Sequence, residues 1–370
     1  MTIGIIGLGA MGLGIAQVYL QAGHTVHATD ASPDARASAA ERLAKSLASR
    51  VAKGALTAGA RDAILARMRI VDRVEDIAPA DLVIEAVIES LAVKQAVFSA
   101  LAALLPPDAV LASNTSSLSV AAIAAGLSQP DRLLGLHFFN PAPAMRLVEL
   151  IPHATTAPDA LLRARALTEG AGKTVIQCAD RPGFIVNRCA RPFYGEALAL
   201  LEEGRAPADV DAAMIGAGYP IGPFGLIDLI GADINLAATE GLFAAMGDHP
   251  RYHVFAALKS QVASGNLGRK TGHGFVYPAT PVPPPADAES ILLRIESTLV
   301  NEVAWLLAEG GSTADGIDTA LRLGLNFPRG PFAMLAQHGR AQVLTTLATL
   351  QSAAPPHLKG RYLPAPDLTR

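Results

Sequence analysis

The chain has 370 residues, which is long enough for two or three domains with a substantial hydrophobic core. Hydrophobic residues make up 51% of the sequence and charged residues 17%, a composition that excludes an intrinsically disordered protein. The formal net charge of −3 gives no sign of nucleic-acid binding, and no apolar run is long enough to predict a membrane span.

Cys178 and Cys189 are the only cysteines, and they fit no metal-binding spacing. We therefore expect two buried free thiols and no metal site. So few cysteines fit a reducing compartment. The sequence opens on an apolar segment with no charged region before it, so we expect no signal peptide and a cytoplasmic protein.

Strand and helix patterns alternate through the first half of the chain. Thr2–Ile6 is an apolar run ended by glycines, as in a buried parallel strand, and Met11–Ala22 follows as a helix. Thr25–Thr29 is the next strand, and two long helices are expected over residues 33–70, broken near Gly54. Further strands are expected at Leu82–Ala86, Val110–Ala112, Leu133–Phe138, Leu147–Ile151 and Thr174–Cys178. This alternation predicts an α/β Rossmann-type fold with a doubly wound parallel sheet over residues 1–182, carrying an inserted helical arm at about 33–70.

The sequence pattern of the second half predicts helices. Helices are expected at about 184–204, 207–217, 222–244 and 250–265, which together form an all-α domain over residues 183–277. The segment Tyr277–Ala286 contains five prolines and is typical of a semi-rigid linker, assigned to residues 278–286.

An internal repeat follows this linker. Glu196–Gly204 matches Glu302–Gly310, Asp211 matches Asp318, and Pro220–Phe224 matches Pro328–Phe332, in the same order. Three matches in order favour duplication of one helical unit over chance. We therefore predict a degenerate second copy of the helical domain over 287–350, followed by a tail over 351–370.

A glycine-rich turn at the start of the chain predicts a dinucleotide site. Gly7, Gly9 and Gly12 follow a strand and open a helix, where they would allow a tight turn, close approach of a pyrophosphate, and helix–sheet packing. Ala10 and Met11 begin that helix, whose N-terminal N–H groups would face the phosphates.

Asp30 lies 18 positions after Gly12, at the end of the next strand, where an adenosine ribose would bind. Its carboxylate would accept hydrogen bonds from the ribose hydroxyls and repel a 2′-phosphate. Ala31 and Ser32 follow it, and no arginine is adjacent in the sequence. We therefore expect NAD rather than NADP.

His137 and Glu149 carry the strongest chemical signal. Oxidising a secondary alcohol requires a base for the O–H proton and a cofactor that takes the hydride. Glu149 lies in the apolar run Leu147–Ile151, where a carboxylate is costly unless it is paired. Bonded to one imidazole nitrogen of His137, it would fix the tautomer and stabilise the imidazolium.

Four blocks resemble the L-3-hydroxyacyl-CoA dehydrogenase family: Gly7–Gly12, Ser113–Leu118, His137–Glu149 and Pro182–Arg188. The resemblance runs to about Tyr277 and continues in the degenerate second copy. It implies NAD-dependent interconversion of a 3-hydroxyacyl-CoA and a 3-oxoacyl-CoA.

The resemblance also implies roles for single residues. His137 and Glu149 match the family's catalytic pair. Ser116 matches a serine that hydrogen-bonds the substrate oxygen, and Asn187 matches an asparagine that polarises the same oxygen from the helical domain.

Four further residues match family positions near the cofactor. Glu89 and Lys94 match a segment that borders the nicotinamide ribose. Asn114 is a further expected cofactor contact, and Asn140 either faces the nicotinamide carboxamide or holds its loop. The alternative for Glu89 and Lys94 is an ordinary charge pair at a solvated helix start.

The helical arm is expected to bind the coenzyme A part of the substrate. Residues 31–70 contain eight Arg or Lys residues and three acids in a chain that is acidic overall. Such a basic excess suits the phosphates of coenzyme A, although a solvated helix face has the same composition. By resemblance, Ser46 and Lys53 fall on coenzyme A-contacting positions.

The second copy is expected to be non-catalytic, because the repeat places Leu293 opposite Asn187. In single-repeat relatives the helical domain pairs with that of another subunit. We expect residues 287–350 to replace that partner as an intramolecular pseudo-dimer, which leaves a monomer or an oligomer formed through another surface.

Two other hypotheses about function remain open at this point. One is an NAD-dependent dehydrogenase of a free 3-hydroxy acid, of the gulonate or hydroxyisobutyrate type. The hydroxyisobutyrate type relies on a helix-borne lysine where this chain has Asn187 and Arg188, which counts against it. The other is a non-catalytic NAD-binding protein, against which the set of four site residues argues.

Overall fold

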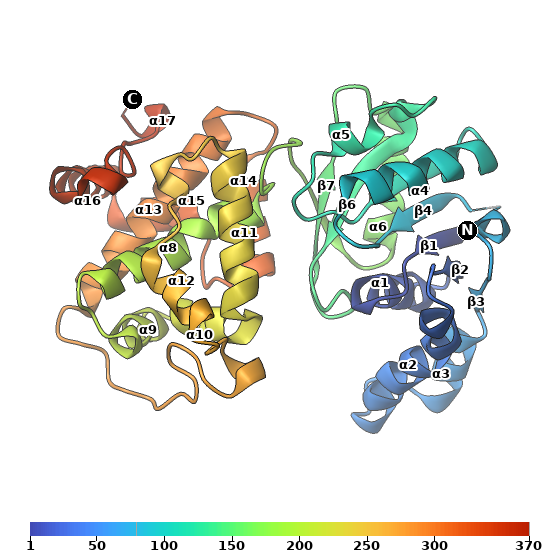
Figure 1. The fold of residues 1–370 in the computed structure, drawn as a ribbon, viewed down its shortest axis with the longest axis horizontal. Helices are drawn as coiled ribbons and strands as arrows, with labels where there is room; N and C mark the ends of the chain where they lie inside the picture. The colour runs from blue at the N-terminus through green and yellow to red at the C-terminus, as the bar shows by residue number, and fades with distance from the viewer. Residues whose placement is uncertain (79, 370) are drawn as a thin grey trace. The chain divides into compact units, whose positions relative to one another are not determined.

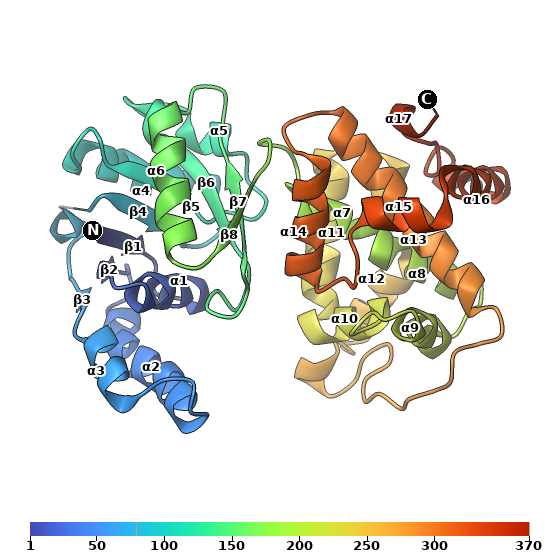
Figure 2. The same ribbon diagram turned by 180° about the vertical axis from the view of Figure 1, so that it is seen from behind.

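The computed structural model describes residues 1–78 and 80–369 and divides into two compact units. Unit 1 comprises Met1–Arg181, and unit 2 begins at Pro182. Unit 1 contains all the named strands, whereas unit 2 is built from helices and loops (Figures 1 and 2). The division lies beside the Pro182–Gly183 turn, where the strand–helix pattern of the sequence ends.

An eight-stranded sheet forms the centre of unit 1, with the strand order β3-β2-β1-β4-β5-β6-β7-β8. Neighbouring strands are parallel except for β6 and β7. The predicted doubly wound sheet is confirmed, but one antiparallel pair interrupts it because the loop from β6 to β7 is too short for a crossover helix. The strands are β1 (Thr2–Ile6), β2 (Thr25–Thr29), β3 (Met68–Ile70), β4 (Leu82–Glu85), β5 (Val110–Ser113), β6 (Leu133–Phe138), β7 (Leu147–Ile151) and β8 (Thr174–Gln177).

Helices cover both faces of this sheet. The Tyr19 hydroxyl lies 2.9 Å from the Thr168 hydroxyl, which joins α1 to α6 on one face, and α4 lies on the opposite face (Figures 1 and 2). The buried apolar side chains of the strands pack between these layers. The helices are α1 (Ala10–Gln21), α2 (Pro33–Ala52), α3 (Ala58–Leu65), α4 (Leu91–Leu104), α5 (Val120–Ala124) and α6 (Pro158–Gly170).

The inserted arm is shorter than the sequence indicated. Helices α2 and α3 are present and separate near Gly54, which has a φ of +69°. Residues Met68–Ile70 were assigned to the second helix, and this was wrong, because they form the edge strand β3. Pairing of Met68 with Val26 of β2 outweighs the helical preference of so short a segment.

Unit 2 contains two sets of helices joined by the proline-rich segment. The helix expected over 222–244 is in fact two helices, because Gly231 adopts a φ of +109° between them. The first set is α7 (Val186–Cys189), α8 (Arg191–Glu202), α9 (Pro207–Gly216), α10 (Pro223–Ile230), α11 (Ala232–Ala245) and α12 (Ala256–Ala263). The second set is α13 (Ala288–Ala308), α14 (Ala314–Leu325), α15 (Pro331–His338), α16 (Arg340–Ala353) and α17 (Pro366–Thr369).

Matching aspartates cap matching helices in the two sets. Asp211 Oδ1 accepts a hydrogen bond from the Phe224 amide of α10 at 2.9 Å, and Asp318 Oδ1 accepts one from the Phe332 amide of α15 at 2.9 Å. A Cβ atom at Gly222 would come within 2.3 Å of the Asp211 carboxyl carbon, so only glycine fits there. In the same way, a Cβ atom at Gly330 would lie 2.1 Å from the Asp318 carboxyl carbon. The repeated sequence therefore encodes a repeated helix cap.

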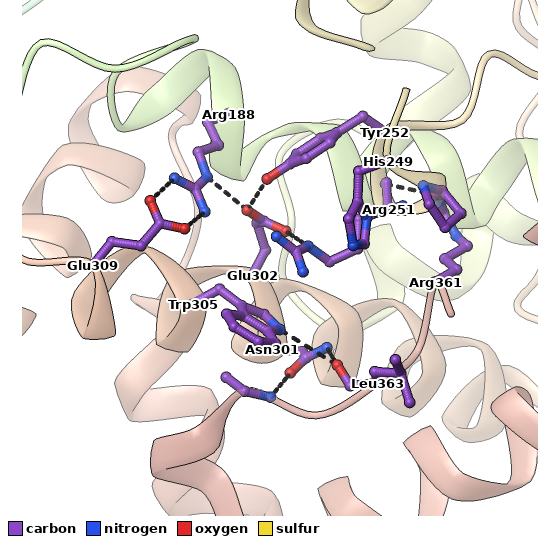
Figure 3. A network of polar contacts seen from close by, with 12 residues as sticks. Arg188, His249, Arg251, Tyr252, Asn301, Glu302, Trp305, Glu309, Arg361 and Leu363 are labelled. Carbon is purple, nitrogen blue, oxygen red and sulfur yellow. Dashed lines mark hydrogen bonds and ion pairs between the residues drawn. The ribbon is translucent and has the colours of Figure 1, made fainter. Parts of the chain in front are cut away.

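A buried carboxylate from each set holds side chains of the other set. Glu302 of α13 is 1% exposed and accepts hydrogen bonds from Arg188 Nε at 2.7 Å, the Tyr252 hydroxyl at 2.6 Å and Arg251 Nε at 3.0 Å (Figure 3). Burial opposes the charge on Arg188, but its bonds to Glu309 and the nearby charge of Glu302 outweigh burial and raise its pKa. The ion pairs are thus strong enough to keep buried arginine charged.

The counterpart in the first set is Glu196 of α8, which is fully buried. It accepts hydrogen bonds from Arg361 Nε at 2.8 Å, Arg294 Nε at 3.0 Å and the Tyr362 hydroxyl at 3.2 Å. The Arg–Tyr pair at 251–252 is therefore repeated at 361–362, inside the segment expected to be a tail. Within the described part of that segment, Arg361 and Tyr362 are buried; residue 370 lies outside the described residues.

We predict that replacing Glu302 with alanine lowers the free energy of unfolding of unit 2 by roughly 3–5 kcal/mol. The substitution leaves the buried cation of Arg188 and its neighbours without their shared carboxylate. Urea unfolding followed by the fluorescence of Trp305 measures this effect, since Trp305 is the only tryptophan and lies in α13.

The matched control is Glu309→Gln, whose side chain is 32% exposed in its ion pair with Arg188. Because water reaches this pair, the expected loss is about 1 kcal/mol or less. Equal losses for the two variants would show that burial of Glu302 adds nothing to the strength of the network.

Candidate active site

His137 and Glu149 face each other across the only antiparallel strand pair in the described sheet. In the register of β6 and β7, His137 lies directly opposite Glu149, and its Nδ1 atom lies 2.7 Å from Glu149 Oε2. His137 is 6% exposed and Glu149 is fully buried. Because an ionised carboxylate only accepts hydrogen bonds, Nδ1 carries the proton and Nε2 holds the lone pair. The pair predicted from the sequence is therefore in contact, and this contact fixes the tautomer of the imidazole.

Glu149 lies in a fully buried strand, and a thiol is among its neighbours. All five residues of β7 are buried, and the Phe139 ring centroid lies 4.5 Å from that of His137. Burial, followed by the charge of Glu149, raises the pKa of the Cys178 thiol well above its usual value. Cys178 and Cys189 are both buried and form no disulfide, as expected. The Cys178 thiol therefore stays protonated near Glu149.

Glu89 organises the loop that carries Ser116. Its Oε1 atom accepts hydrogen bonds from the Thr115 hydroxyl at 2.6 Å and from the amides of Ser116 and Ser117 at 3.0 and 3.1 Å. Partial burial would raise the pKa of Glu89, but the bond from Thr115 and the charge of Lys94 outweigh it, so the pKa is lowered. An ionised carboxylate thus fixes the backbone of the serine loop.

Lys94 is more deeply buried than a residue at a solvated helix start. It is 1% exposed, and its Nζ atom lies 2.7 Å from Glu85 Oε1 and 3.1 Å from Glu89 Oε2. Glu85 is fully buried and also accepts a hydrogen bond from the Ser113 hydroxyl at 2.7 Å. Glu85 and Ser113 were not predicted as site residues from the sequence, although a carboxylate at the end of the apolar strand β4 is the same signal that identified Glu149.

Asn114 connects the serine loop to the strand of His137. Its side-chain oxygen accepts a hydrogen bond from the Phe138 amide at 2.8 Å. Since Phe138 follows His137 directly, this bond fixes the end of β5 against the end of β6. The geometry gives Asn114 a positioning contact within the protein; the expected contact with the cofactor stays a prediction.

The glycine turn has the shape that a dinucleotide requires. A Cβ atom at Gly7, which has a φ of +99°, would lie 2.6 Å from the Ala86 carbonyl oxygen, and one at Gly12 would lie 1.9 Å from the Gly7 carbonyl oxygen. A Cβ atom at Gly9 would instead meet nothing within 4 Å. Gly7 and Gly12 are therefore required by the protein itself, whereas Gly9 leaves open space for a pyrophosphate beside the N-terminus of α1, which Ala10 and Met11 begin.

Asp30 is held in place at the end of β2. Its two carboxylate oxygens accept hydrogen bonds from the Leu8 amide at 2.7 Å and the Ser32 amide at 2.8 Å. No arginine is adjacent to Asp30 in the sequence, as stated, but the fold brings Arg36 beside it, and Arg36 Nη1 donates to the Asp30 carbonyl oxygen at 2.6 Å. Arg36 comes from the next helix, so sequence adjacency could not reveal it. That the Asp30 carboxylate favours NAD over NADP stays a prediction.

A cavity of about 720 Å³ lies between the glycine turn, the arm and the loop after β6 within unit 1. Its lining includes Ala10, Ser46, Arg50 and Asn140. The Ser46 hydroxyl also donates to the side-chain oxygen of Gln17 at 2.8 Å, which ties the arm to α1. Lys53 is exposed at the end of α2 and is not part of this lining.

Asn187 belongs to unit 2, in α7. Its backbone carbonyl accepts a hydrogen bond from Arg191 Nε at 3.0 Å, and its side chain is partly buried. The turn before α7 needs Gly183, which has a φ of +76° and whose Cβ position lies 2.9 Å from the Arg188 amide. Asn187 thus lies in unit 2, whereas the other residues of the predicted site lie in unit 1.

No group of three or more His, Cys, Asp or Glu residues in the described ranges could hold a metal ion. Among the same residues, none of the helices has the length and apolar character needed to cross a membrane.

Comparison with known proteins identifies the family. The NAD-binding domain model of 3-hydroxyacyl-CoA dehydrogenase matches residues 2–181, and the C-terminal domain model of the same family matches residues 183–277 and 291–367. The second match continues to residue 367, beyond the expected end of the second copy at residue 350.

Relatives of two lengths resemble the chain. The 3-hydroxyadipyl-CoA dehydrogenase of Escherichia coli is 35% identical, over 95% of this chain and 93% of that relative. A probable 3-hydroxybutyryl-CoA dehydrogenase of Bacillus subtilis is 40% identical, over 73% of this chain and 95% of that relative.

A solved structure covers the whole fold. The crystal structure of a 3-hydroxybutyryl-CoA dehydrogenase from Escherichia coli aligns with 100% of this chain and 97% of its own, with a TM-score of 0.93 and 33% identity. Together with the two domain models, this similarity shows that the chain belongs to the 3-hydroxyacyl-CoA dehydrogenase family and is an NAD-dependent oxidoreductase.

Proposed function

We propose that the chain interconverts an L-3-hydroxyacyl-CoA and the corresponding 3-oxoacyl-CoA, with His137 as the general base and acid. The observation that carries this proposal is the 2.7 Å contact between His137 Nδ1 and Glu149 Oε2 in two fully buried strands. A buried imidazole whose Nδ1 proton is held by a carboxylate is prepared to accept a proton at Nε2.

In the oxidation direction, Nε2 of His137 takes the proton of the 3-hydroxyl group. Bound NAD supplies the hydride acceptor. Glu149 stabilises the imidazolium that forms, because its charge is desolvated and directly bonded to the ring. In the reduction direction the same imidazolium returns the proton to the oxygen of the substrate.

Ser116 and Asn187 are proposed to bind the reacting oxygen. Ser116 is exposed on a loop whose amides are fixed by Glu89, so its hydroxyl is presented on a rigid backbone. Glu89 binds the amides of this loop, and Lys94 holds Glu89 in place while it also contacts Glu85. We propose that Glu89 and Lys94 also border the nicotinamide ribose. Asn140, on the lining of the 720 Å³ cavity, is proposed as a cofactor contact.

The arm of α2 and α3 is proposed to bind coenzyme A. Ser46 lines the cavity and Lys53 lies at the exposed end of α2, about two turns further along the same helix. A cation there suits the phosphates of coenzyme A. The acyl part is proposed to be short, because the similar proteins are named for 3-hydroxybutyryl-CoA and 3-hydroxyadipyl-CoA.

The second copy is proposed to act as a built-in partner for the first. Each copy supplies a buried glutamate, Glu196 or Glu302, that accepts hydrogen bonds from an arginine and a tyrosine of the other copy. This reciprocal pattern supports a pseudo-twofold arrangement. The Bacillus relative is matched over 95% of its length by 73% of this chain, as expected if that relative has a single helical copy.

One assay tests the proposed reaction against the free-acid alternative. We expect NADH oxidation, followed by absorbance, with acetoacetyl-CoA and little or none with free acetoacetate. Preference for free acetoacetate would identify the chain as a dehydrogenase of free 3-hydroxy acids. No turnover of either acetoacetyl-CoA or acetoacetate would support a non-catalytic role.

Replacing His137 with glutamine is expected to lower kcat by roughly 10²- to 10⁴-fold, the usual contribution of a general base. NADH binding should change little, because His137 acts on the substrate proton. Steady-state kinetics together with NADH fluorescence titration separate these effects, and turnover near the wild-type rate would remove His137 from the mechanism.

Replacing Glu149 with glutamine is expected to lower kcat and to move the pH dependence. Without the carboxylate charge the imidazolium is less stable relative to neutral His137. The acidic limb of alcohol oxidation, which requires the neutral ring, should therefore move to lower pH. Rates measured across pH 5–10 check this, and an unchanged profile would make the carboxylate purely structural.

Asp30 is expected to decide the choice of cofactor. The wild-type protein should use NAD far better than NADP, since the 2′-phosphate would meet a carboxylate. Asp30→Ser should narrow that preference, because Arg36 lies beside the same backbone. The double variant with Arg36→Met serves as the control and should not gain activity with NADP. Comparable kcat/KM for both cofactors in the wild type contradicts the assignment.

Ending the chain at Ala286 is expected to produce aggregation or a new dimer. Truncation removes the second copy and leaves Glu196 without Arg294 and Arg361. Size-exclusion chromatography with light scattering distinguishes these states from the full chain. If the truncated protein remains a stable, active monomer, the second copy covers nothing essential.

A further inference from the structure

Arg191, at the first position of α8, is a buried cation without an acidic partner among the described residues. It is 8% exposed. Arg188 and Arg361, the other buried arginines among the described residues of unit 2, each contact at least one glutamate. A buried charge without a counter-ion is costly, so its retention calls for an explanation.

The contacts of Arg191 leave part of its hydrogen-bonding capacity unused. Nε donates to the Asn187 carbonyl at 3.0 Å, and Nη1 donates to the Thr239 hydroxyl at 2.9 Å. The guanidinium carbon also lies 4.9 Å from the centroid of the Tyr194 ring. Nη2 has no hydrogen-bond partner among the described residues, so the guanidinium keeps donors for a further group.

The electrostatic surroundings of Arg191 are unfavourable to its charge. Burial lowers the pKa of Arg191, and the Tyr194 hydroxyl is the one neighbouring group that raises it. In contrast, glutamates raise the pKa of Arg188 despite its burial. An incoming anion would therefore find at Arg191 a charge that the protein has not already neutralised.

The position of Arg191 relates this charge to the proposed site. Asn187 and Arg191 are four residues apart, and Ala190 between α7 and α8 keeps a helical conformation, so both side chains lie on one face. Helical side chains lean toward the N-terminus, which places the guanidinium beside Asn187. The helix rises about 6 Å over four residues, a distance that a few carbons of an acyl chain span.

We propose that Arg191 binds a carboxylate at the far end of the acyl chain, which makes this protein selective for dicarboxylyl-CoA substrates such as 3-hydroxyadipyl-CoA. This inference rests on the proposed function, in which Asn187 contacts the oxygen at carbon 3. The planar guanidinium can form two parallel hydrogen bonds with a carboxylate, a geometry that a lysine cannot reproduce. Arg191 is thus assigned as a specificity-determining residue, and His137 remains the catalytic base.

The test compares 3-oxoadipyl-CoA with 3-oxohexanoyl-CoA, which has the same chain length but no terminal acid. Wild-type kcat/KM should be at least about tenfold higher for the dicarboxylyl substrate, since hydrogen bonds to charged groups contribute that much or more. Arg191→Met should lower kcat/KM for 3-oxoadipyl-CoA by roughly 10- to 100-fold and leave that for 3-oxohexanoyl-CoA within about threefold. The exposed Arg340 provides the charge control, and Arg340→Met should change neither value.

A binding measurement separates recognition from chemistry. Calorimetric titration with adipyl-CoA and hexanoyl-CoA, which lack the reacting oxygen, should show tighter binding of adipyl-CoA that disappears in Arg191→Met. If that variant does not fold, Arg191→Lys keeps the charge and removes the paired hydrogen bonds, and it should lose most of the preference.

Three results would overturn the proposal. They are equal wild-type efficiency with the two substrates, equal losses with both in Arg191→Met, or equal binding of the two saturated esters. Each of them leaves the proposed reaction standing if acetoacetyl-CoA is still reduced in a manner that depends on His137. Absence of that reduction would instead remove the proposed function itself.

Discussion

The antiparallel pairing of β6 with β7 is the constraint on which the candidate site depends. It places Glu149 opposite His137 and buries the carboxylate completely. A shift of β7 by one residue in this register would turn Glu149 to the other face of the sheet and separate it from His137. Because Glu149 is fully buried, the loss of this contact would be costly. The register that is stable is therefore also the register that orients a base.

Around this pair, buried charges are compensated in small networks that fix loops. Glu85, Lys94 and Glu89 form a continuous series of contacts from the end of β4 to the amides of the Ser116 loop. Asn114 joins that loop to the residue after His137. Rigid positioning of this kind lowers the reorganisation needed during reaction, which is how a fold contributes to catalysis before any substrate binds.

In unit 2 the same logic acts through duplication. Each copy contributes a glutamate, and each glutamate is held by arginines and a tyrosine, including the Arg–Tyr pair of the other copy. Repetition of the aspartate cap at Asp211 and Asp318 shows that local structure was duplicated together with the contacts. Arg191 differs from these arginines, because none of the described acidic side chains contacts it. In the proposed specificity role, its charge would bind a ligand instead of a glutamate of the protein.

The sequence by itself determined the local features of this protein. Glycine spacing, apolar runs and a carboxylate in an apolar strand are read within a few residues, so they predicted the turn at Gly7, most of the strands and the pair His137–Glu149. Features that depend on residues far apart were decided by tertiary structure. Met68–Ile70 became a strand because β2 offered an edge, and Arg36 came beside Asp30 because α2 folds back. Arg361 and Tyr362 are buried because they donate hydrogen bonds to the buried carboxylate of Glu196. Which residues from distant parts of the chain pair with an edge strand or a buried carboxylate is a property of the folded chain, and the local sequence pattern does not specify it.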